Sequence, residues 1–259
     1  MTEVHPRTEH MVDHRGARLY AVEAGSGDPL ILFHGGLANH QACWLFAAPL
    51  AARFRVITPD LRGSGRSHFA GPLSWDLLAD DVAALARELG IERAVVGGTS
   101  FGAGLAVRVA LRHRALVRGL VVLNPAYGGA AHGFTAAQSA AMNAMDAAGS
   151  RAVAEGVDVL LPLFDALPDE IRERARALVR TYDAASVATS TRFMASAAQP
   201  FERGDELAAM DVPALLVPGL DPTHPREVAD VYRRHLPRVT VTDCDPSGYA
   251  EAITRWWSW

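Results

Sequence analysis

The sequence predicts an α/β fold: a doubly wound, mostly parallel sheet with a helical insert before the last two strands. Three observations lead to this prediction. Short apolar runs alternate with helix-like patterns, the alternation stops between about residues 128 and 208, and a glycine-flanked serine separates a predicted strand from a predicted helix. The chain has 259 residues, 49% of them hydrophobic, which suits one core domain carrying an insert.

The amino-terminal part predicts a hairpin followed by buried strands. Residues 10–23 hold two short runs that are split by Arg15-Gly16, a pair suited to a tight turn. The later apolar runs are short and rich in β-branched residues, which is typical of strands in a parallel sheet covered on both faces. These runs are 30–33, 54–58, 94–96, 120–123, 214–217 and 239–241.

Helical patterns lie between these runs, most clearly over 77–89 and 102–113. The stretch 128–208 contains further helical segments, such as 136–148 and 169–179, and no convincing strand. We therefore predict a core formed by 1–127 and 209–259, with 128–208 as the helical insert.

Composition excludes several kinds of chemistry. All 25 residues counted as lysine or arginine are arginines, so a lysine Schiff base and a Walker A phosphate site are both excluded. A net charge of −4 gives no electrostatic reason to expect a nucleic-acid partner. Two cysteines cannot form a disulfide framework, and no dinucleotide or convincing metal motif is present. We expect neither a cofactor nor a metal.

The sequence also bears on location and partners. No apolar run reaches the roughly 18 residues that a membrane-spanning helix needs. The first residues lack the basic and apolar regions of a signal peptide. We therefore expect a cytoplasmic protein without a membrane partner, active on a small molecule as a monomer or homodimer.

The strongest motif is the segment Gly98-Thr99-Ser100-Phe101-Gly102. It follows a predicted strand and opens a predicted helix, the context in which G-x-S-x-G forms a nucleophile elbow. Such a turn projects the serine hydroxyl, and the helix start offers free N–H groups to an oxyanion. We predict Ser100 as nucleophile and the Phe101 N–H as one oxyanion donor. His34-Gly35-Gly36 ends an earlier strand, and its Gly36 N–H is the expected second donor.

With these motifs, the sequence resembles the α/β-hydrolase superfamily, especially its esterase and enol-lactonase-like branch. The resemblance covers nearly the whole chain, through HGG at 34–36, DLRGSGRS at 60–67, GTSFG at 98–102, LNPA at 123–126 and VPGLDPTHP at 217–225. It implies that 128–208 is a cap over the active site. It also implies a catalytic acid after a late strand, a role that falls on Asp221.

The same resemblance implies a histidine base in a Gly-His pair after the last strand. Here Gly248 is followed by Tyr249, and no histidine occurs after His235. A neutral phenol donates a proton but accepts one poorly, since tyrosine titrates near pH 10. His224, three residues after Asp221, is the best alternative base.

This departure leaves three functions open. In the first, Ser100 attacks a small ester, lactone or thioester, with His224 or the substrate itself as base. In the second, the pocket serves a non-hydrolytic lyase, cyclase or acyl-migration enzyme in which Tyr249 donates a hydrogen bond or a proton. In the third, the chain is a catalytically inactive protein that binds a small ligand.

Overall fold

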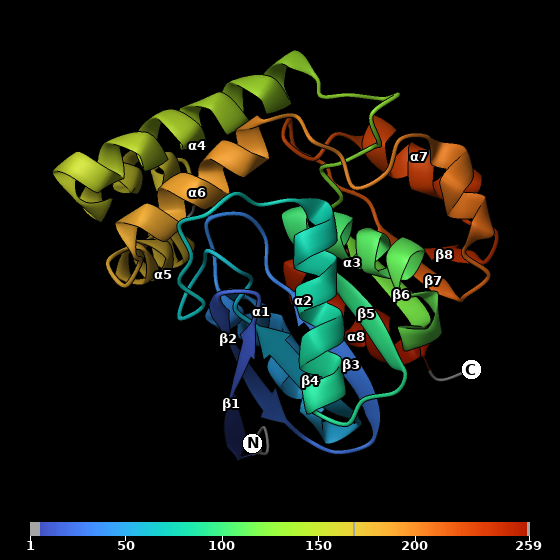
Figure 1. Cartoon of the computed structure of the whole chain (residues 1–259). Coiled ribbons are helices and arrows are strands. Elements are labelled where there is room, and N and C mark those ends of the chain that lie inside the picture. The colour runs from blue at the N-terminus through green and yellow to red at the C-terminus, as the bar shows by residue number, and fades with distance from the viewer. Residues whose placement is uncertain (1–5, 168, 258–259) are drawn as a thin grey trace.

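The computed structural model describes residues 6–167 and 169–257, which contain an eight-stranded sheet (Figure 1). The strand order is β1-β2-β4-β3-β5-β6-β7-β8, and every neighbouring pair from β4 to β8 is parallel. This confirms the predicted fold class. The strands are β1 (Arg7–His14), β2 (Ala17–Ala24), β3 (Asp28–Phe33), β4 (Phe54–Pro59), β5 (Ala94–Thr99), β6 (Val117–Leu123), β7 (Ala214–Val217) and β8 (Val239–Val241).

The predicted opening hairpin is present as β1 and β2, which pair antiparallel over their full length. Arg15 and Gly16 connect them with φ angles of 42° and 76°. Positive φ at both central residues gives the turn the twist of the flanking strands, and glycine adopts it without strain. Strand β2 also pairs antiparallel with β4, so the antiparallel part of the sheet lies at one edge.

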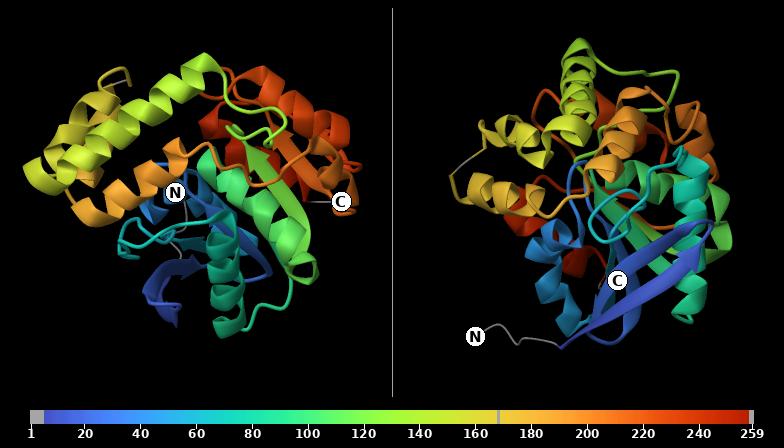
Figure 2. Two further views of the ribbon diagram at one scale, coloured as in Figure 1. Left: turned by 45° about the horizontal axis from the view of Figure 1, so that its top comes forward. Right: turned by 60° about the vertical axis from the view of Figure 1, so that its left-hand side comes forward.

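Helices cover both faces of the sheet. Alternate strand residues point to opposite sides, and apolar residues lie on both sides and are buried by these helices. In β3, Ile31 and Phe33 face the core beneath α2, α3 and α7, whereas Leu30 and Leu32 face α1 and α8. Figure 2 shows these two layers from two further directions. The helices are α1 (His40–Ala47), α2 (Trp75–Glu88), α3 (Phe101–Arg112), α7 (Arg226–His235) and α8 (Tyr249–Trp256), with short 3₁₀ turns η1 (Ala48–Ala52), η2 (Arg114–Leu116) and η5 (Pro246–Gly248).

The chain between β6 and β7 forms the helical insert. It comprises α4 (Ala136–Glu155), η3 (Val157–Phe164), α5 (Asp169–Val179), α6 (Ala184–Ala195) and η4 (Gly204–Ala209). Helices α4 and α6 lie side by side across one end of the sheet (Figures 1 and 2). Thr135 and Gln138 form a capping box at the start of α4. Among the described residues, no helix is both long and apolar enough to cross a membrane.

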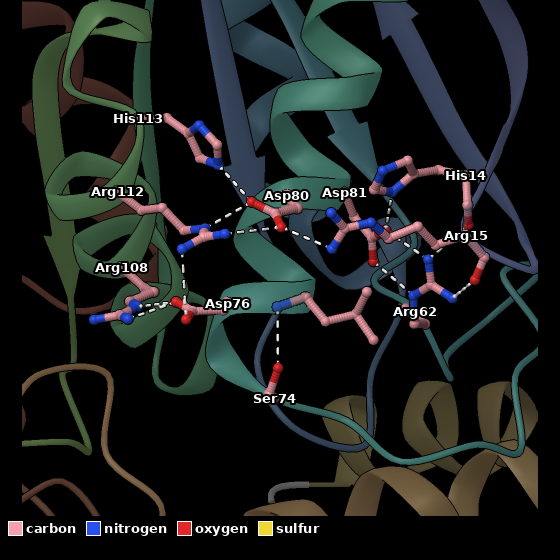
Figure 3. Close-up of polar contacts among 11 residues, drawn as sticks. His14, Arg15, Arg62, Ser74, Asp76, Asp80, Asp81, Arg108, Arg112 and His113 are labelled. Atoms are coloured by element: carbon pink, nitrogen blue, oxygen red, sulfur yellow. Dashed lines mark hydrogen bonds and ion pairs between the residues drawn. The ribbon is translucent and has the colours of Figure 1, made fainter.

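A buried ion pair anchors the loop after β4 to α2. The Arg62 side chain is fully buried, and its guanidinium donates to both carboxylate oxygens of Asp81 at 2.6 and 2.8 Å (Figure 3). It also donates to the carbonyl oxygens of His14 and Arg15 in the hairpin turn. These bonds fix the loop that continues to Ser64, which lies beside His34 in the site described below.

We expect Asp81→Asn to lower the free energy of unfolding by about 3 to 5 kcal/mol, because it leaves the buried Arg62 charge without its carboxylate. Urea denaturation measures this change. Asp13→Asn is the matched control, since the pair between Asp13 and Arg18 is exposed and worth less than about 1 kcal/mol. Equal effects from the two substitutions would contradict the prediction.

The neighbouring Asp80 gives the fold a pH-dependent contribution. A hydrogen bond from Arg112, supported by His113 and Arg15, lowers the pKa of Asp80 from 3.8 to about 2 (Figure 3). Since the folded-state pKa is depressed, the stabilisation is present above about pH 4 and is lost as the pH falls toward 2. We expect the stability difference between the wild type and Asp80→Asn to shrink over this interval in denaturation curves. A difference that stays constant would refute the assignment.

Candidate active site

Ser100 lies on a sharp turn between β5 and α3, as the nucleophile elbow predicts. Its backbone has φ 55° and ψ −113°, a conformation that a non-glycine residue adopts only when its surroundings impose it. Those surroundings include a hydrogen bond from the Ser100 N–H to the Leu123 carbonyl, and Ala103 N–H donating to the Ser100 carbonyl. The side chain is half-buried.

The two flanking glycines are required by close packing. A Cβ atom at Gly98 would lie 2.7 Å from the Phe33 carbonyl oxygen and 2.6 Å from the Gly102 carbonyl carbon. A Cβ at Gly102 would lie 2.5 Å from the Phe33 oxygen. No other residue type fits at these two positions without a backbone shift, so the end of β3 is pressed against the start of α3 beside Ser100.

The segment after β3 therefore lies next to the serine. A Cβ built at Gly35 would be 3.6 Å from the Ser100 Cβ. His34 braces this segment: its Nδ1 lies 2.7 Å from the Gly35 carbonyl oxygen, and its Nε2 accepts from Leu61 N–H. Burial lowers the pKa of His34, which favours the neutral ring that this pattern needs. The predicted oxyanion donors Gly36 and Phe101 thus come from adjacent segments.

Asp221 and His224 form a short turn after β7. Asp221 Oδ1 accepts from the backbone N–H groups of Thr223 and His224, at 2.8 and 3.0 Å, and from Thr223 Oγ1. Asp221 Oδ2 lies 2.8 Å from His224 Nδ1. Burial alone would raise the pKa of Asp221, but the hydrogen bonds from Thr223 and His224 outweigh it, and the pKa lies below its ordinary value. The carboxylate is therefore the stable form.

The turn brings His224 onto the serine. His224 Nε2 lies 2.8 Å from Ser100 Oγ, although 124 residues separate the two in the chain. With Nδ1–H donated to Asp221, the Nε2 lone pair faces the hydroxyl. The His224 side chain is 20% exposed and that of Asp221 52% exposed. Ser100, His224 and Asp221 thus form one continuous hydrogen-bonded chain.

Tyr249 is the residue expected to donate a hydrogen bond or a proton in the non-hydrolytic function. It is the first residue of α8, it is buried, and its ring packs edge-on against Phe46 with centroids 5.4 Å apart. Burial raises the pKa of Tyr249, and its hydroxyl has no hydrogen-bond partner in the described part of the chain. The phenol makes no hydrogen bond to Ser100, His224 or Asp221, although the Asp221 charge is near enough to add to the raised pKa of Tyr249.

Helix α6 of the insert contacts the core beside the segment after β3. Met194 Sδ lies 2.5 Å from where a Cβ of Gly36 would be, so the thioether rests directly on that glycine. Phe193 packs against Trp75, which stacks on Phe101 with centroids 4.8 Å apart. A cavity of about 30 Å³ remains beside Gly36. Its lining includes His34, Gly35, Gly36, Leu61, Phe101 and Met194.

Two contributors to this arrangement were not predicted from the sequence. Thr223 supplies a backbone and a hydroxyl donor to Asp221; the Asp-Pro-Thr order is a recognisable signal for such an Asx turn. Met194 reaches Gly36 from 158 positions further along the chain, and no local signal marks that contact.

Solved structures of similar fold cover almost the whole chain. A thermophilic esterase from Thermogutta terrifontis matches with a TM-score of 0.79 and 24% identity, over 97% of each chain. The enol-lactonase from Burkholderia xenovorans matches with a TM-score of 0.79 and 19% identity, over 97% of this chain and all of its own. At these identities the likeness establishes the fold.

Curated relatives are more similar in sequence over shorter segments. A soluble epoxide hydrolase from a Corynebacterium species is 38% identical over 121 residues, which are 45% of this chain and 41% of that protein. A 2-hydroxymuconate semialdehyde hydrolase from a Pseudomonas species is 35% identical over 116 residues, 43% of this chain and 41% of its own. The matches thus span about two fifths of each relative.

A family model described as the alpha/beta hydrolase fold matches residues 28–248. This range runs from the start of β3 to the residue before α8, and it includes the elbow, the segment after β3 and the Asp221–His224 turn. The resemblance stated from the motifs is therefore confirmed, and the chain belongs to the alpha/beta hydrolase family.

Proposed function

We propose that this protein is a serine hydrolase that cleaves small esters, lactones or thioesters. Ser100 is the nucleophile, His224 the general base, and Asp221 the group that orients His224. The observation that carries the proposal is the pair of 2.8 Å contacts that join Ser100 Oγ to His224 Nε2 and His224 Nδ1 to Asp221 Oδ2. This is the geometry that activates a serine hydroxyl.

In the first half-reaction, Ser100 Oγ attacks the substrate carbonyl carbon while its proton passes to His224 Nε2. The carbonyl oxygen becomes an oxyanion that accepts hydrogen bonds from the N–H groups of Gly36 and Phe101. The tetrahedral intermediate then expels the alcohol or thiol, which takes the proton from His224. An acyl group remains on Ser100.

In the second half-reaction, His224 removes a proton from water, and the resulting hydroxide attacks the acyl carbon. Collapse of the second intermediate returns the proton to Ser100 Oγ and releases the carboxylic acid. The Asp221 carboxylate stabilises the imidazolium formed in each step without taking its proton. The low pKa of Asp221 suits this role, because the carboxylate must stay ionised beside the charged ring.

The alternatives to hydrolysis rested on the lack of a base near Ser100. The imidazole nitrogen 2.8 Å from the hydroxyl favours the proposal that His224 supplies this base. The alpha/beta hydrolase relatives reported above, named as hydrolases, also favour a hydrolytic reaction. We also propose that the helical insert acts as a cap, since Met194 and Phe193 cover the groups around Ser100.

Ser100→Ala and His224→Gln should each lower kcat/KM for p-nitrophenyl acetate by about 10⁴- to 10⁶-fold, because each removes a group that the attack requires. Stoichiometric labelling of the wild type at Ser100 by a fluorophosphonate, read by mass spectrometry, reports the activated hydroxyl directly. An active Ser100→Ala variant would end the proposal.

Tyr249→Phe removes only the phenol oxygen and keeps the buried ring. Because that oxygen makes no hydrogen bond to Ser100, His224 or Asp221, we expect kcat and KM for the same ester to stay within about twofold of the wild type. Steady-state kinetics on the purified variant decide the matter. A loss of tenfold or more would return the phenol to the mechanism.

We also propose that the cavity beside Gly36 receives the acyl group of the substrate. About 30 Å³ holds roughly two water-sized groups, so we expect acetyl esters to be preferred over butyryl and hexanoyl esters. Met194→Ala opens this space and should raise the hexanoate-to-acetate ratio of kcat/KM by about 10-fold or more. Met210→Ala, which truncates a buried methionine that does not line this cavity, is the control. Equal ratios in both variants would show that Met194 does not limit the acyl group.

A further inference from the structure

The turn that carries both Asp221 and His224 needs a support outside itself. Its outer side faces solvent, and the preceding residue Leu220 is 76% exposed. The hydrogen bonds of Asp221 close the turn internally but do not fix it to the sheet. In the described structure, apart from the His224–Ser100 bond, its hydrogen bond to another element comes from Gln138 in the first turn of α4.

Gln138 is fully buried, and both ends of its amide are used. Nε2 donates to the Ala126 carbonyl oxygen at 2.7 Å and to the Thr223 carbonyl oxygen at 3.1 Å. Oε1 accepts from Thr135 N–H at 3.1 Å. These partners also fix which end is nitrogen, because only N–H groups can face two carbonyl oxygens.

One side chain of the insert therefore ties together two loops of the core. Ala126 follows β6, and Thr223 lies between Asp221 and His224 in the loop after β7. Strands β5, β6 and β7 are neighbours in the sheet, and β5 leads directly to Ser100. A shift of the Thr223 carbonyl would move the His224 ring relative to the hydroxyl it faces.

We propose that Gln138 is a positioning residue that holds the Asp221–His224 turn in register with Ser100. The proposal rests on the proposed function for the roles of those three groups. It also makes the insert part of the catalytic apparatus, since α4 fixes the base from a segment that lies outside the core sheet.

The two ends of the amide separate positioning from helix capping. Gln138→Glu keeps an oxygen that accepts from Thr135 N–H, and its negative charge suits a helix start. It removes the donors and sets a carboxylate against two carbonyl oxygens. Gln138→Met removes both functions without burying a charge, so it serves where Gln138→Glu does not fold.

Both variants should lower kcat for p-nitrophenyl acetate by about 10- to 100-fold with KM changed less than about threefold, because a displacement near 1 Å is enough to misplace the base. Fluorophosphonate labelling of Ser100 should slow by a similar factor. Thr135→Ala is the matched control: it removes the Oγ1 acceptor of Gln138 N–H and leaves the amide donors in place. It should lower the melting temperature while kcat stays within twofold.

Labelling within twofold of the wild type in a folded Gln138 variant would overturn the proposal. An equal loss in Thr135→Ala would also overturn it, by assigning the effect to the start of α4. A second measurement does not depend on turnover. In NMR spectra of ¹⁵N-histidine protein, assigned with His224→Gln, the His224 ring should show protonated Nδ1 in the wild type and exchange broadening in Gln138→Met. Unchanged His224 signals in Gln138→Met would refute the positioning role. If the wild type shows the expected His224 signals but the fluorophosphonate does not label its Ser100, only the serine hydrolase proposal is refuted.

Discussion

The geometry of the site depends on how one carboxylate divides its two oxygens. Asp221 Oδ1 accepts three hydrogen bonds from Thr223 and His224, which close the turn, and Oδ2 accepts from the His224 ring. The same side chain thus shapes the backbone that carries His224 and orients the imidazole ring. Because the acid and the imidazole belong to one four-residue turn, little conformational entropy remains to be lost when they meet.

Placing the imidazole in this turn changes what the end of the chain must do. Residues after β8 are free to serve packing, and Tyr249 does so among α1 and α8 residues on one face of the sheet. The elbow itself is independent of this change, because its strain is imposed by β3, β6 and α3.

Local sequence patterns predict the strands, the hairpin and the helical insert. Apolar runs mark the strands, Arg15-Gly16 marks the hairpin turn, and helical periodicity without strands marks the insert. The sequence also predicts the position of Ser100, because close backbone contacts require glycine at positions 98 and 102 and so produce a recognisable motif. The sequence distinguishes less clearly whether His224 or Tyr249 lies beside Ser100, because the answer depends on the hydrogen bonds of a folded turn, which the sequence does not show. Gln138 and Met194 could not be found at all: each acts on a loop at least 80 residues away, and at its own position looks like helix capping or core packing.

The presence of Asp221 and His224 in one turn also changes how the connections along the chain constrain the site. In a site assembled from two separate loops, the acid and the base meet only when the chain between them has folded. Here α7, β8 and α8 all follow the turn, and within the described chain they contribute no member of the hydrogen-bonded chain. Changes in the connections between these elements therefore leave the spacing of Asp221 and His224 along the chain unchanged, so the carboxyl-terminal segment answers to packing with the sheet rather than to the site.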